Sequence, residues 1–359
     1  MKPKRSLARR IDRFLVPWRR CAWPLDWHDV FGRTAPLALE IGFGNGEFLA
    51  QEAREHPERD YVGLEISWES TLRLMHRIVK YELRNVRVAL GDAELLTGVL
   101  FAPDTLVECT LNHPCPWPKD RHHKRRLIQA PFLSVLAERL RMDAVVTIQT
   151  DHADYARWIG EALEAQRDLV SCFETTEVAS LGERMSTKYQ CKATDAGVPI
   201  HYFRWRKARD PQPRPQLPYL TPPASFPTTS ETMPSVTLTG PFDIEQLFEG
   251  FTSRVTRAEH EGQDVHVRLH GAWRHAERPA WLIETLTREG KLDQDFALLV
   301  QRDDAGRLLL KDSQFGHPHP TWGVRRALWE AAAYVLERHP ELVLHHHNLG
   351  DAAELSSPR

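Results

Sequence analysis

The first two hundred residues alternate short apolar runs with longer amphipathic stretches. The apolar runs predict five strands, at 37–40, 60–67, 85–93, 105–114 and 144–151. The fourth is nearly all apolar, as expected for a parallel strand that is buried on both faces. Helical periodicity predicts intervening helices over 47–55, 69–82, 122–141 and 152–166. This alternation predicts an α/β fold built on a doubly wound parallel sheet.

The pattern changes beyond residue 168. Residues 168–207 suggest an antiparallel edge, with strands at 188–192 and 200–207. Residues 211–234 contain eight prolines, which exclude a helix or a central strand and predict an extended linker. A strand at 265–273, a hairpin at 296–312 and a helix at 323–338 then predict a small α+β domain. The predicted organisation is an N-terminal arm (1–34), an α/β domain (35–208), a linker (209–239) and a C-terminal α+β domain (240–359).

Composition excludes several classes of protein. None of the apolar runs among the 359 residues approaches the ~20 residues of a membrane span. The N-terminus is basic but lacks the apolar core of a signal peptide. The five cysteines form no CxxC pair, which argues against a zinc site or a disulfide framework. The run 345–347 has three histidines, but adjacent side chains rarely face one ion. We therefore expect a cytoplasmic protein with no membrane partner and no metal; its oligomeric state stays open.

Charge is unevenly distributed along the chain. Residues 241–359 carry 14 Lys/Arg against 19 Asp/Glu, whereas residues 1–20 carry eight basic residues and one acid. Residues 119–126 hold five basic residues, two histidines and one acid. A polyanionic partner is therefore expected to meet the first two thirds of the chain. The arm is also rich in aromatic residues, which suits either packing on the core or contact with nucleic-acid phosphates.

The segment 37–49 predicts a nucleotide site. An apolar strand ends at Glu40, and Gly42, Gly44 and Gly46 follow before a helix begins. Glycines serve where the chain takes positive φ or where the backbone approaches a ligand. A dinucleotide fold has the spacing G-x-G-x-x-G, whereas this chain has G-x-G-x-G after an acid. An acid at this point suits the cationic end of S-adenosylmethionine better than a pyrophosphate. Acids at the ends of the second and third strands, Glu65 and Asp92, suit ribose and adenine.

The loop after the fourth strand points to a family. It reads Asn112-His-Pro-Cys-Pro-Trp-Pro-Lys119 and runs into the basic segment 120–126. The sequence here resembles the bacterial tRNA (guanine-N7-)-methyltransferase family, whose pattern is approximately N-F-P-D-P-W-P-K-x-R-H-x-K-R-R-L. The resemblance covers about residues 35–207 and includes the glycine turn, GLE at 63–65 and GDA at 91–93. It implies a Rossmann-like methyltransferase sheet that transfers a methyl group from S-adenosylmethionine to guanine N7 in tRNA.

The resemblance also implies roles for individual residues. Glu40 is expected near the charged end of the methyl donor and Glu65 near its ribose. The full cofactor-binding set is Glu40, Gly42, Gly44, Gly46, Glu65, Asp92, Asn112 and Cys115. The guanine and its nucleotide are expected to contact Lys119, Asp151, Thr187 and Gln190. The tRNA backbone is expected along Arg121, His122, His123, Lys124, Arg125 and Arg126.

Three positions depart from the family pattern. His113 stands where the family has phenylalanine, Cys115 where it has a catalytic aspartate, and Gln190 where it has a glutamate. Guanine N7 has a lone pair and no proton, so its methylation needs no general base. A carboxylate still helps by holding the guanine edge and by stabilising the cationic product, an effect of about 10²–10³ in rate. Glutamine keeps a hydrogen-bond acceptor without the charge.

Cys115 has three interpretations. It is a neutral spacer in a working pocket, the mark of a weakened enzyme, or a nucleophile of the kind used in cytosine methylation. Two alternative functions follow. One is a methyltransferase with another nucleic-acid target, because Asn112-x-Pro114 distantly resembles the loop of amino-group methylases. The other is a tRNA-binding protein that keeps the fold with weak or no activity.

Overall fold

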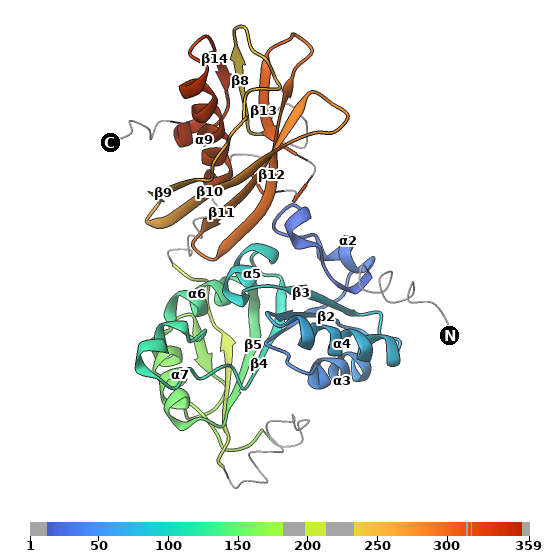
Figure 1. The fold of residues 1–359 in the computed structure, drawn as a ribbon. Helices are drawn as coiled ribbons and strands as arrows, with labels where there is room; N and C mark the ends of the chain where they lie inside the picture. Colours follow the sequence, from blue (N-terminus) through green and yellow to red (C-terminus); the bar gives the residue numbers. More distant parts are fainter. Residues whose placement is uncertain (1–12, 182–197, 213–232, 314, 317, 354–359) are drawn as a thin grey trace. The chain divides into compact units, whose positions relative to one another are not determined.

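The computed structural model describes residues 13–181, 198–212, 233–313, 315–316 and 318–353. The chain divides into two compact units, Met1–Gln216 and Leu217–Arg359 (Figure 1). The division falls within the predicted linker, most of which lies outside the described residues. Each unit has its own sheet. No helix in the described part of the chain combines the length and the hydropathy that a bilayer crossing requires.

The first unit is built on a seven-stranded sheet with the order β3-β2-β1-β4-β5-β7-β6. Strands β1 to β5 pair in parallel, and β7 pairs antiparallel with both β5 and β6. The predicted α/β class with a Rossmann-like doubly wound sheet is confirmed. The strands are β1 (Leu37–Ile41), β2 (Asp60–Glu65), β3 (Val86–Leu90), β4 (Leu106–Asn112), β5 (Leu140–Thr150), β6 (Leu169–Ser171) and β7 (His201–Lys207).

The helices of this unit follow from the strand order. The connections from β1 to β2 and β3 run one way along the sheet, and those from β3 to β4 and β5 run the other way. Right-handed crossovers therefore place α3 and α4 on one face, and α5 and α6 on the other. Helix α3 packs on α4, and α6 packs on both α5 and α7. The helices are α3 (Glu47–Glu55), α4 (Trp68–Lys80), α5 (Ala93–Leu100), α6 (Ala130–Arg139) and α7 (Ala153–Ala165).

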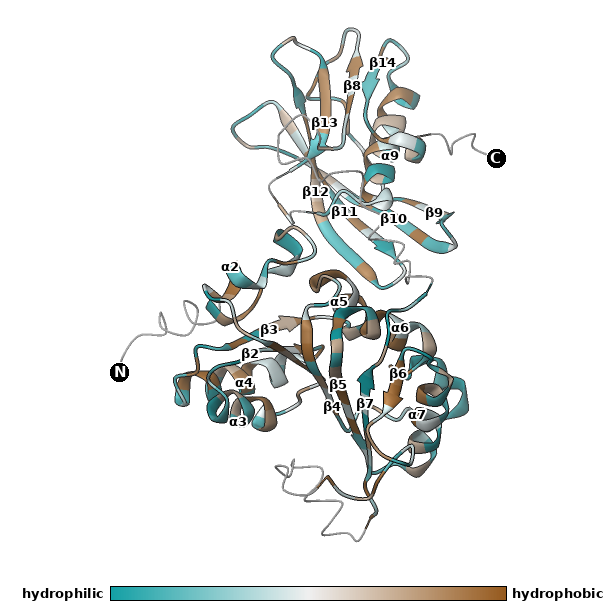
Figure 2. Ribbon diagram, turned by 180° about the vertical axis from the view of Figure 1, so that it is seen from behind, coloured by the Kyte–Doolittle hydropathy of each residue, from teal (hydrophilic) through white to brown (hydrophobic). Residues whose placement is uncertain are grey.

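This topology gathers the predicted site residues at one edge. The carboxyl ends of parallel strands meet at the same edge, and ligands of doubly wound folds bind outside it. Glu40, Glu65 and Asn112 lie at the ends of β1, β2 and β4, while Asp92 and Asp151 follow β3 and β5. Hydrophobic colour dominates the middle of this sheet, as Figure 2 shows, so the polar ends stand out against an apolar interior.

The long helix predicted over 122–141 is wrong. The structure has a 3-10 helix, η2 (Asp120–Arg125), then an extended stretch before α6 begins at Ala130. Pro131 lies in the first turn of α6, and a proline disfavours helical geometry in the residue before it. The helix therefore begins next to the proline, at Ala130, and β5 begins directly after the helix at Leu140. The basic run 120–126 thus lies in a short 3-10 helix and its C-cap, and not in α6.

The antiparallel edge is partly as predicted. The strand predicted at 200–207 is β7, and its antiparallel pairing with β5 is confirmed. The strand predicted at 188–192 lies outside the described residues. The sequence did not predict β6, which has only three residues and pairs with the C-terminal end of β7.

The described part of the N-terminal arm packs on the sheet. Trp18, Trp23 and Trp27 are buried. The Trp18 indole donates to the Leu90 carbonyl (Nε1···O 3.0 Å), and Trp27 donates to the Leu100 carbonyl (3.2 Å). These aromatic residues therefore serve the core, which is one of the two interpretations of the arm. Residues 1–12, which hold most of its basic charge, lie outside the described residues.

The second unit has an antiparallel sheet with the order β14-β8-β13-β12-β11-β10-β9. The apolar face of α9 covers it, with Ala327, Leu328 and Ala331 fully buried. The predicted α+β class and the 296–312 hairpin are confirmed. The elements are β8 (Ser235–Thr239), β9 (Arg254–His260), β10 (Gln263–Arg274), β11 (Ala280–Glu289), β12 (Leu292–Arg302), β13 (Leu308–Asp312), α9 (Trp322–Arg338) and β14 (Val343–His347).

Candidate functional site

The glycine turn after β1 has left-handed geometry at all three glycines. The φ values are 70° at Gly42, 53° at Gly44 and 68° at Gly46. A Cβ at Gly46 would lie 2.7 Å from Leu74 Cβ, so this position has no room for a side chain. A Cβ at Gly42 or Gly44 would meet no atom within 4 Å, so open space borders the turn. This geometry forms a cradle of backbone that a ligand can approach closely.

Glu65 at the end of β2 holds this turn in place. Its Oε2 accepts a hydrogen bond from Gly44 N (3.0 Å). Its Oε1 accepts from Ile66 N (2.9 Å) and Ser67 N (3.0 Å). The carboxylate therefore fixes the backbone of the glycine turn from the neighbouring strand. Two carboxylate oxygens offer about four acceptor sites, so the predicted contact with a ribose is compatible with these bonds and stays a prediction.

Asp92 at the end of β3 caps a helix. Its Oδ1 accepts from Leu95 N (3.0 Å), which satisfies one of the free N–H groups in the first turn of α5. The side chain is half-buried at the same edge of the sheet as Glu65. Its predicted contact with adenine is not tested by this geometry.

Glu40 and Asn112 join the two central strands at the edge. Glu40 is 2% exposed, and its Oε1 accepts from Asn112 Nδ2 (2.9 Å). The bond links the ends of β1 and β4, where the strand order reverses direction. The reversal is the point at which doubly wound sheets bind ligands, so the structure places both predicted residues at the expected crevice.

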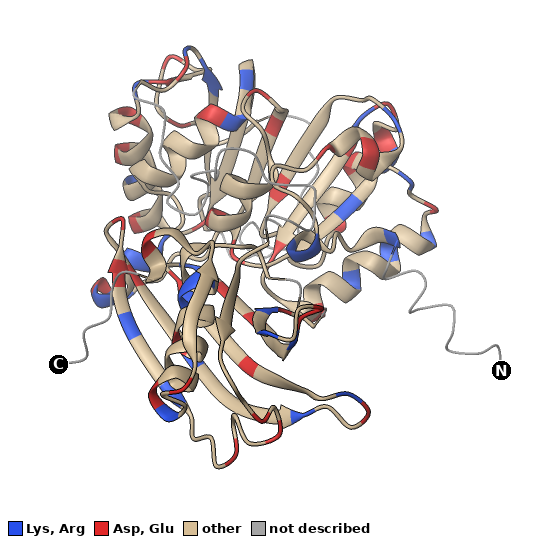
Figure 3. Cartoon of the chain, turned by 90° about the horizontal axis from the view of Figure 1, so that it is seen from above, with Lys and Arg blue, Asp and Glu red and all other residues tan. Residues whose placement is uncertain are grey.

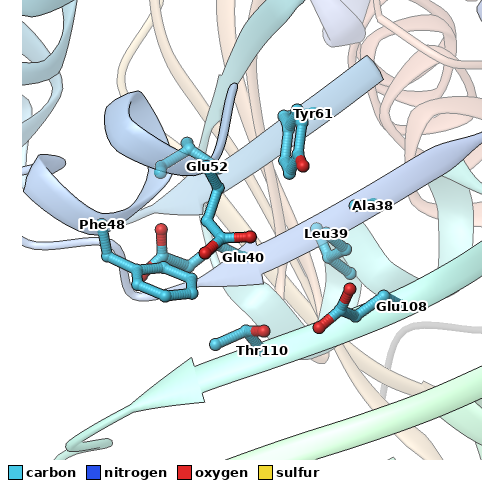
Figure 4. Close-up of a pocket in the computed structure, with 9 residues that line it drawn as sticks. Ala38, Leu39, Glu40, Phe48, Glu52, Tyr61, Glu108 and Thr110 are labelled. Carbon is cyan, nitrogen blue, oxygen red and sulfur yellow. The ribbon is translucent and has the colours of Figure 1, made fainter. Parts of the chain in front are cut away.

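An acid-lined pocket lies beside Glu40. Figure 4 shows the carboxyl groups of Glu40, Glu52 and Glu108 and the hydroxyl of Tyr61 around one space between α3 and the sheet. Burial and the neighbouring Glu52 raise the pKa of Tyr61 above its usual range. Among the described residues, no group hydrogen-bonds to the Tyr61 hydroxyl. The complete lining is Ala38, Leu39, Glu40, Phe48, Leu49, Glu52, Tyr61, Glu108 and Thr110.

The linear pattern of residues did not predict this pocket, although one signal was present. Phe48 and Glu52 are four residues apart on α3, so they share the face that meets the sheet. Tyr61 and Glu108 come from β2 and β4, on either side of β1. Their convergence depends on the strand order, which the sequence did not provide.

The loop after β4 is strained at two residues. His113 and Trp117 have φ values of 51° and 43°, which non-glycine residues rarely adopt. His113 is held there by its own N–H, which donates to the Gln149 carbonyl of β5 (2.8 Å). Cys115, at the position of the family aspartate, is exposed. The loop therefore offers a thiol, and not a carboxylate, at the surface of the candidate site.

A histidine–aspartate pair lies at the base of this loop. His113 Nδ1 is 3.2 Å from Asp151 Oδ1. Burial lowers the pKa of His113, while the hydrogen bond to Asp151 acts in the opposite direction. The sequence analysis named both residues but did not connect them. The signal was available, because each residue follows directly after one of two strands, β4 and β5, that are adjacent in the sheet.

Arg126 was predicted to contact RNA, and the structure buries it. Arg126 is 3% exposed, and its Nε donates to the Pro116 carbonyl (2.9 Å). Its guanidinium lies 5.1 Å from the ring centroid of Tyr155 and 4.9 Å from that of Trp158. Arg126 therefore links the loop after β4, through its hydrogen bond, to α7, through its contacts with the two aromatic rings. The basic residues next to Arg126 in the sequence do not indicate that Arg126 is buried.

The rest of the basic run lies nearer the surface. Lys119, Arg121, Lys124 and Arg125 are exposed, and the Arg125 guanidinium lies 5.1 Å from the ring centroid of Trp117. His122 and His123 are half-buried and contact Trp117 and Trp158 edge-on, respectively. The predicted substrate residues Thr187 and Gln190 lie outside the described residues.

Comparison with known proteins identifies the same region. A family model described as "Putative methyltransferase" matches residues 34–203. A tRNA (guanine-N(7)-)-methyltransferase of Alkalilimnicola ehrlichii is 36% identical over 225 residues, which cover 58% of this chain and 95% of that protein. A protein of the same name from Thiobacillus denitrificans is 41% identical over 56% of this chain and 86% of its own length.

A third relative is matched over a smaller share of its length. The tRNA (guanine-N(7)-)-methyltransferase of Thermotoga maritima is 40% identical over 197 residues, and the match covers 55% of this chain and 62% of that protein. The residues matched by the family model end before the second unit begins. This chain belongs to the tRNA (guanine-N(7)-)-methyltransferase family, because its matches to the Alkalilimnicola and Thiobacillus proteins cover 95% and 86% of those proteins.

Proposed function

We propose that this chain transfers the methyl group of S-adenosylmethionine to N7 of a guanine in tRNA. Membership of the family carries the proposal, because all the predicted cofactor and substrate residues lie within the matched range 34–203. Within the proposal, residues 35–208 form the catalytic domain and the partner is tRNA in the cytoplasm. The arm (1–34), the linker (209–239) and the domain 240–359 are accessory to that chemistry.

The glycine turn fits the methyl donor. When bound, S-adenosylmethionine supplies an electrophilic methyl group on a cationic sulfonium. The turn has open space next to Gly42 and Gly44, and Glu65 holds it from β2. Glu40, which accepts a hydrogen bond from Asn112 at this edge, adds negative potential that suits a cation better than a phosphate. Glu40, Asn112 and the glycine turn are therefore proposed to hold the donor.

Asp151 is the described carboxylate proposed to face the guanine. Its side chain is 40% exposed at the end of β5, so a ligand can reach it. Methylation makes the guanine cationic, and a fixed carboxylate stabilises that charge as it develops. Cys115 gives no negative charge in its thiol form, so Asp151 carries more of this stabilisation than the family pattern requires. Lys119 and Cys115 are proposed to border the same nucleotide.

The tRNA backbone is proposed to lie along the exposed basic residues Lys119, Arg121, Lys124 and Arg125. Figure 3 shows basic and acidic residues interspersed along the chain, so the attraction to a polyanion is local and not a property of a whole face. Each Lys or Arg that neutralises a phosphate releases counterions, which makes binding fall as salt rises. We therefore expect tRNA affinity with a marked salt dependence.

The test is transfer of a tritiated methyl group to tRNA that lacks N7-methylguanosine. After digestion to nucleosides, the label is expected in N7-methylguanosine. The variant Asp151→Asn, which keeps the size of the side chain and removes the charge, is expected to lower the rate by about 10²–10³. Label on another nucleoside would favour a methyltransferase with a different target. Binding of tRNA without any transfer would favour a binding protein that has lost the chemistry.

Restoring the family aspartate tests the departure at Cys115. We expect the variant Cys115→Asp to change the rate by less than about tenfold, because Asp151 already supplies a carboxylate and preorganised groups act on the same charge. A larger rise would show that the native pocket is compromised. The variant Cys115→Ser is the matched control, because it keeps the size and adds no charge.

A further inference from the structure

The contact between His113 and Asp151 lies inside the proposed site, and no role has been given to His113. The side chain of His113 is 5% exposed, whereas that of Asp151 is 40% exposed. Their contact joins Nδ1 to Oδ1 at 3.2 Å. One end of the pair is therefore inside the protein, and the other end is open to a ligand. A buried imidazole held in place in this way can orient an exposed carboxylate.

A backbone hydrogen bond fixes the position of His113. Its N–H donates to the Gln149 carbonyl, two residues before Asp151 on the neighbouring strand (N···O 2.8 Å). Its φ of 51° places it in the left-handed region, which non-glycine residues occupy at a cost when the surroundings require it. The position of the imidazole is thus fixed relative to the end of β5. In the described part of the chain, no other group hydrogen-bonds to the Asp151 side chain.

The chemistry of the contact determines which atom carries the proton. An ionised carboxylate only accepts hydrogen bonds, so His113 Nδ1 must carry the proton that it donates to Oδ1. Burial favours the neutral imidazole, because it disfavours the charged form. A neutral donor orients Asp151 without cancelling its negative charge. Oδ2 then remains as an acceptor, and the carboxylate keeps its negative charge.

We propose that His113 is a positioning residue that fixes the Asp151 carboxylate toward the guanine. The proposal rests on the proposed function, because it gives His113 a part in recognising the same substrate. In the pattern of the resembling family this position is phenylalanine, which has no donor, and the neighbouring position is aspartate. This chain therefore lacks the family carboxylate at 115 and has, at 113, a hydrogen-bond donor that contacts the carboxylate at 151.

The experiment is a double-mutant cycle between residues 113 and 151. His113→Phe removes the donor and keeps an aromatic ring of similar size. His113→Asn is the conservative variant, because asparagine keeps a donor at a similar distance from the backbone and tolerates positive φ. Each is made in the native chain and in Asp151→Asn. Thermal unfolding and binding of S-adenosylhomocysteine confirm that every variant is folded.

In the native background, His113→Phe is expected to lower kcat for tRNA methylation by about tenfold, since a misplaced group costs rate. His113→Asn is expected to stay within about threefold of the native rate, and KM for S-adenosylmethionine is expected to stay unchanged in both. In the Asp151→Asn background, His113→Phe is expected to have less than about a twofold effect, since coupled residues are not additive. Equal losses in the two backgrounds, or no loss in the native chain, would overturn the proposal.

The same cycle measured on the Kd for tRNA separates this proposal from the function on which it rests. If the native chain puts no label on guanine N7, the proposed function fails on that result alone. The positioning role is then judged by binding. It stands if His113→Phe weakens tRNA binding about tenfold with Asp151 present and less than about twofold in Asp151→Asn. It fails if the two backgrounds lose binding equally or if neither loses any.

Discussion

The turn after β1 and the loop after β4 lie at the same edge of the sheet, yet different forces hold them. The turn is fixed by three glycines with positive φ and by the Glu65 carboxylate, which binds the backbone N–H of Gly44. The loop is fixed by side-chain hydrogen bonds and by a backbone bond from His113 N to the Gln149 carbonyl of β5 (2.8 Å). Arg126 binds the Pro116 carbonyl, and Asn112 binds Glu40.

This difference explains why one segment follows the family pattern and the other departs from it. A backbone turn at positive φ accepts little besides glycine, so its sequence has few alternatives. A loop held by side chains can exchange one partner for another as long as the shape is kept. Cys115 and His113 both fall in this loop; Cys115 is exposed, and His113 contacts Asp151.

The largest effect is expected from Gly46→Ala in the turn. The added Cβ takes a left-handed conformation, at about 1–2 kcal/mol, and presses on Leu74, at about 1–3 kcal/mol more. We expect the free energy of unfolding to fall by about 2–5 kcal/mol, with weaker binding of S-adenosylmethionine. Urea unfolding and calorimetric titration measure the two effects.

Gly42→Ala is the matched control for that prediction. Gly42 has almost the same φ as Gly46, but a Cβ there meets no atom within 4 Å. Its cost to stability is therefore expected to be about 1–2 kcal/mol, from the backbone alone. If both variants lost the same stability, contact with Leu74 would not be what distinguishes the two glycines.

An intermediate effect is expected from Arg126→Ala in the loop. The variant loses a charged hydrogen bond to the Pro116 carbonyl and the contacts with two aromatic rings. We expect the free energy of unfolding to fall by about 2–4 kcal/mol. The exposed Arg121 is the control, and Arg121→Ala is expected to leave stability within about 0.5 kcal/mol.

In tRNA binding the order of the two variants is expected to reverse, with the larger effect in Arg121→Ala and the smaller in Arg126→Ala. Arg121→Ala is expected to reduce the slope of log K against log salt by about one, because one phosphate contact is lost. Arg126→Ala is expected to leave that slope unchanged in the folded protein. A reduced slope for Arg126→Ala would mean that its guanidinium leaves the interior to meet phosphate.

The smallest effect is expected from the titration of His113. Burial lowers its pKa in the folded chain, so the unfolded chain binds the proton more readily. Stability is therefore present above the ordinary histidine pKa of about 6.5 and is lost as pH falls below it. The slope for one proton is at most about 1.4 kcal/mol per pH unit. His113→Phe is expected to flatten the dependence of stability between pH 7.5 and 5.5, measured by urea unfolding. An unchanged slope would show that other groups control it.

The parallel core of the first unit was predictable because its signals are local. Each strand is an apolar run, and each site acid of that core lies at or just after the end of one. The prediction failed over 122–141, where apolar periodicity was read across Pro131. It also omitted β11 in the second unit, whose alternating pattern contains polar residues that are buried, such as Thr285 and Thr287.

What the amino-acid sequence determined by itself was the glycine turn, the acids at the strand ends and the family. These depend on φ preferences and on residue spacing within short segments. Only the tertiary structure decided that Arg126 is buried, that His113 meets Asp151 and that three carboxylates share a pocket with Tyr61. Each of these contacts joins segments that become neighbours through strand order and helix packing. A linear pattern of residues does not contain those distances.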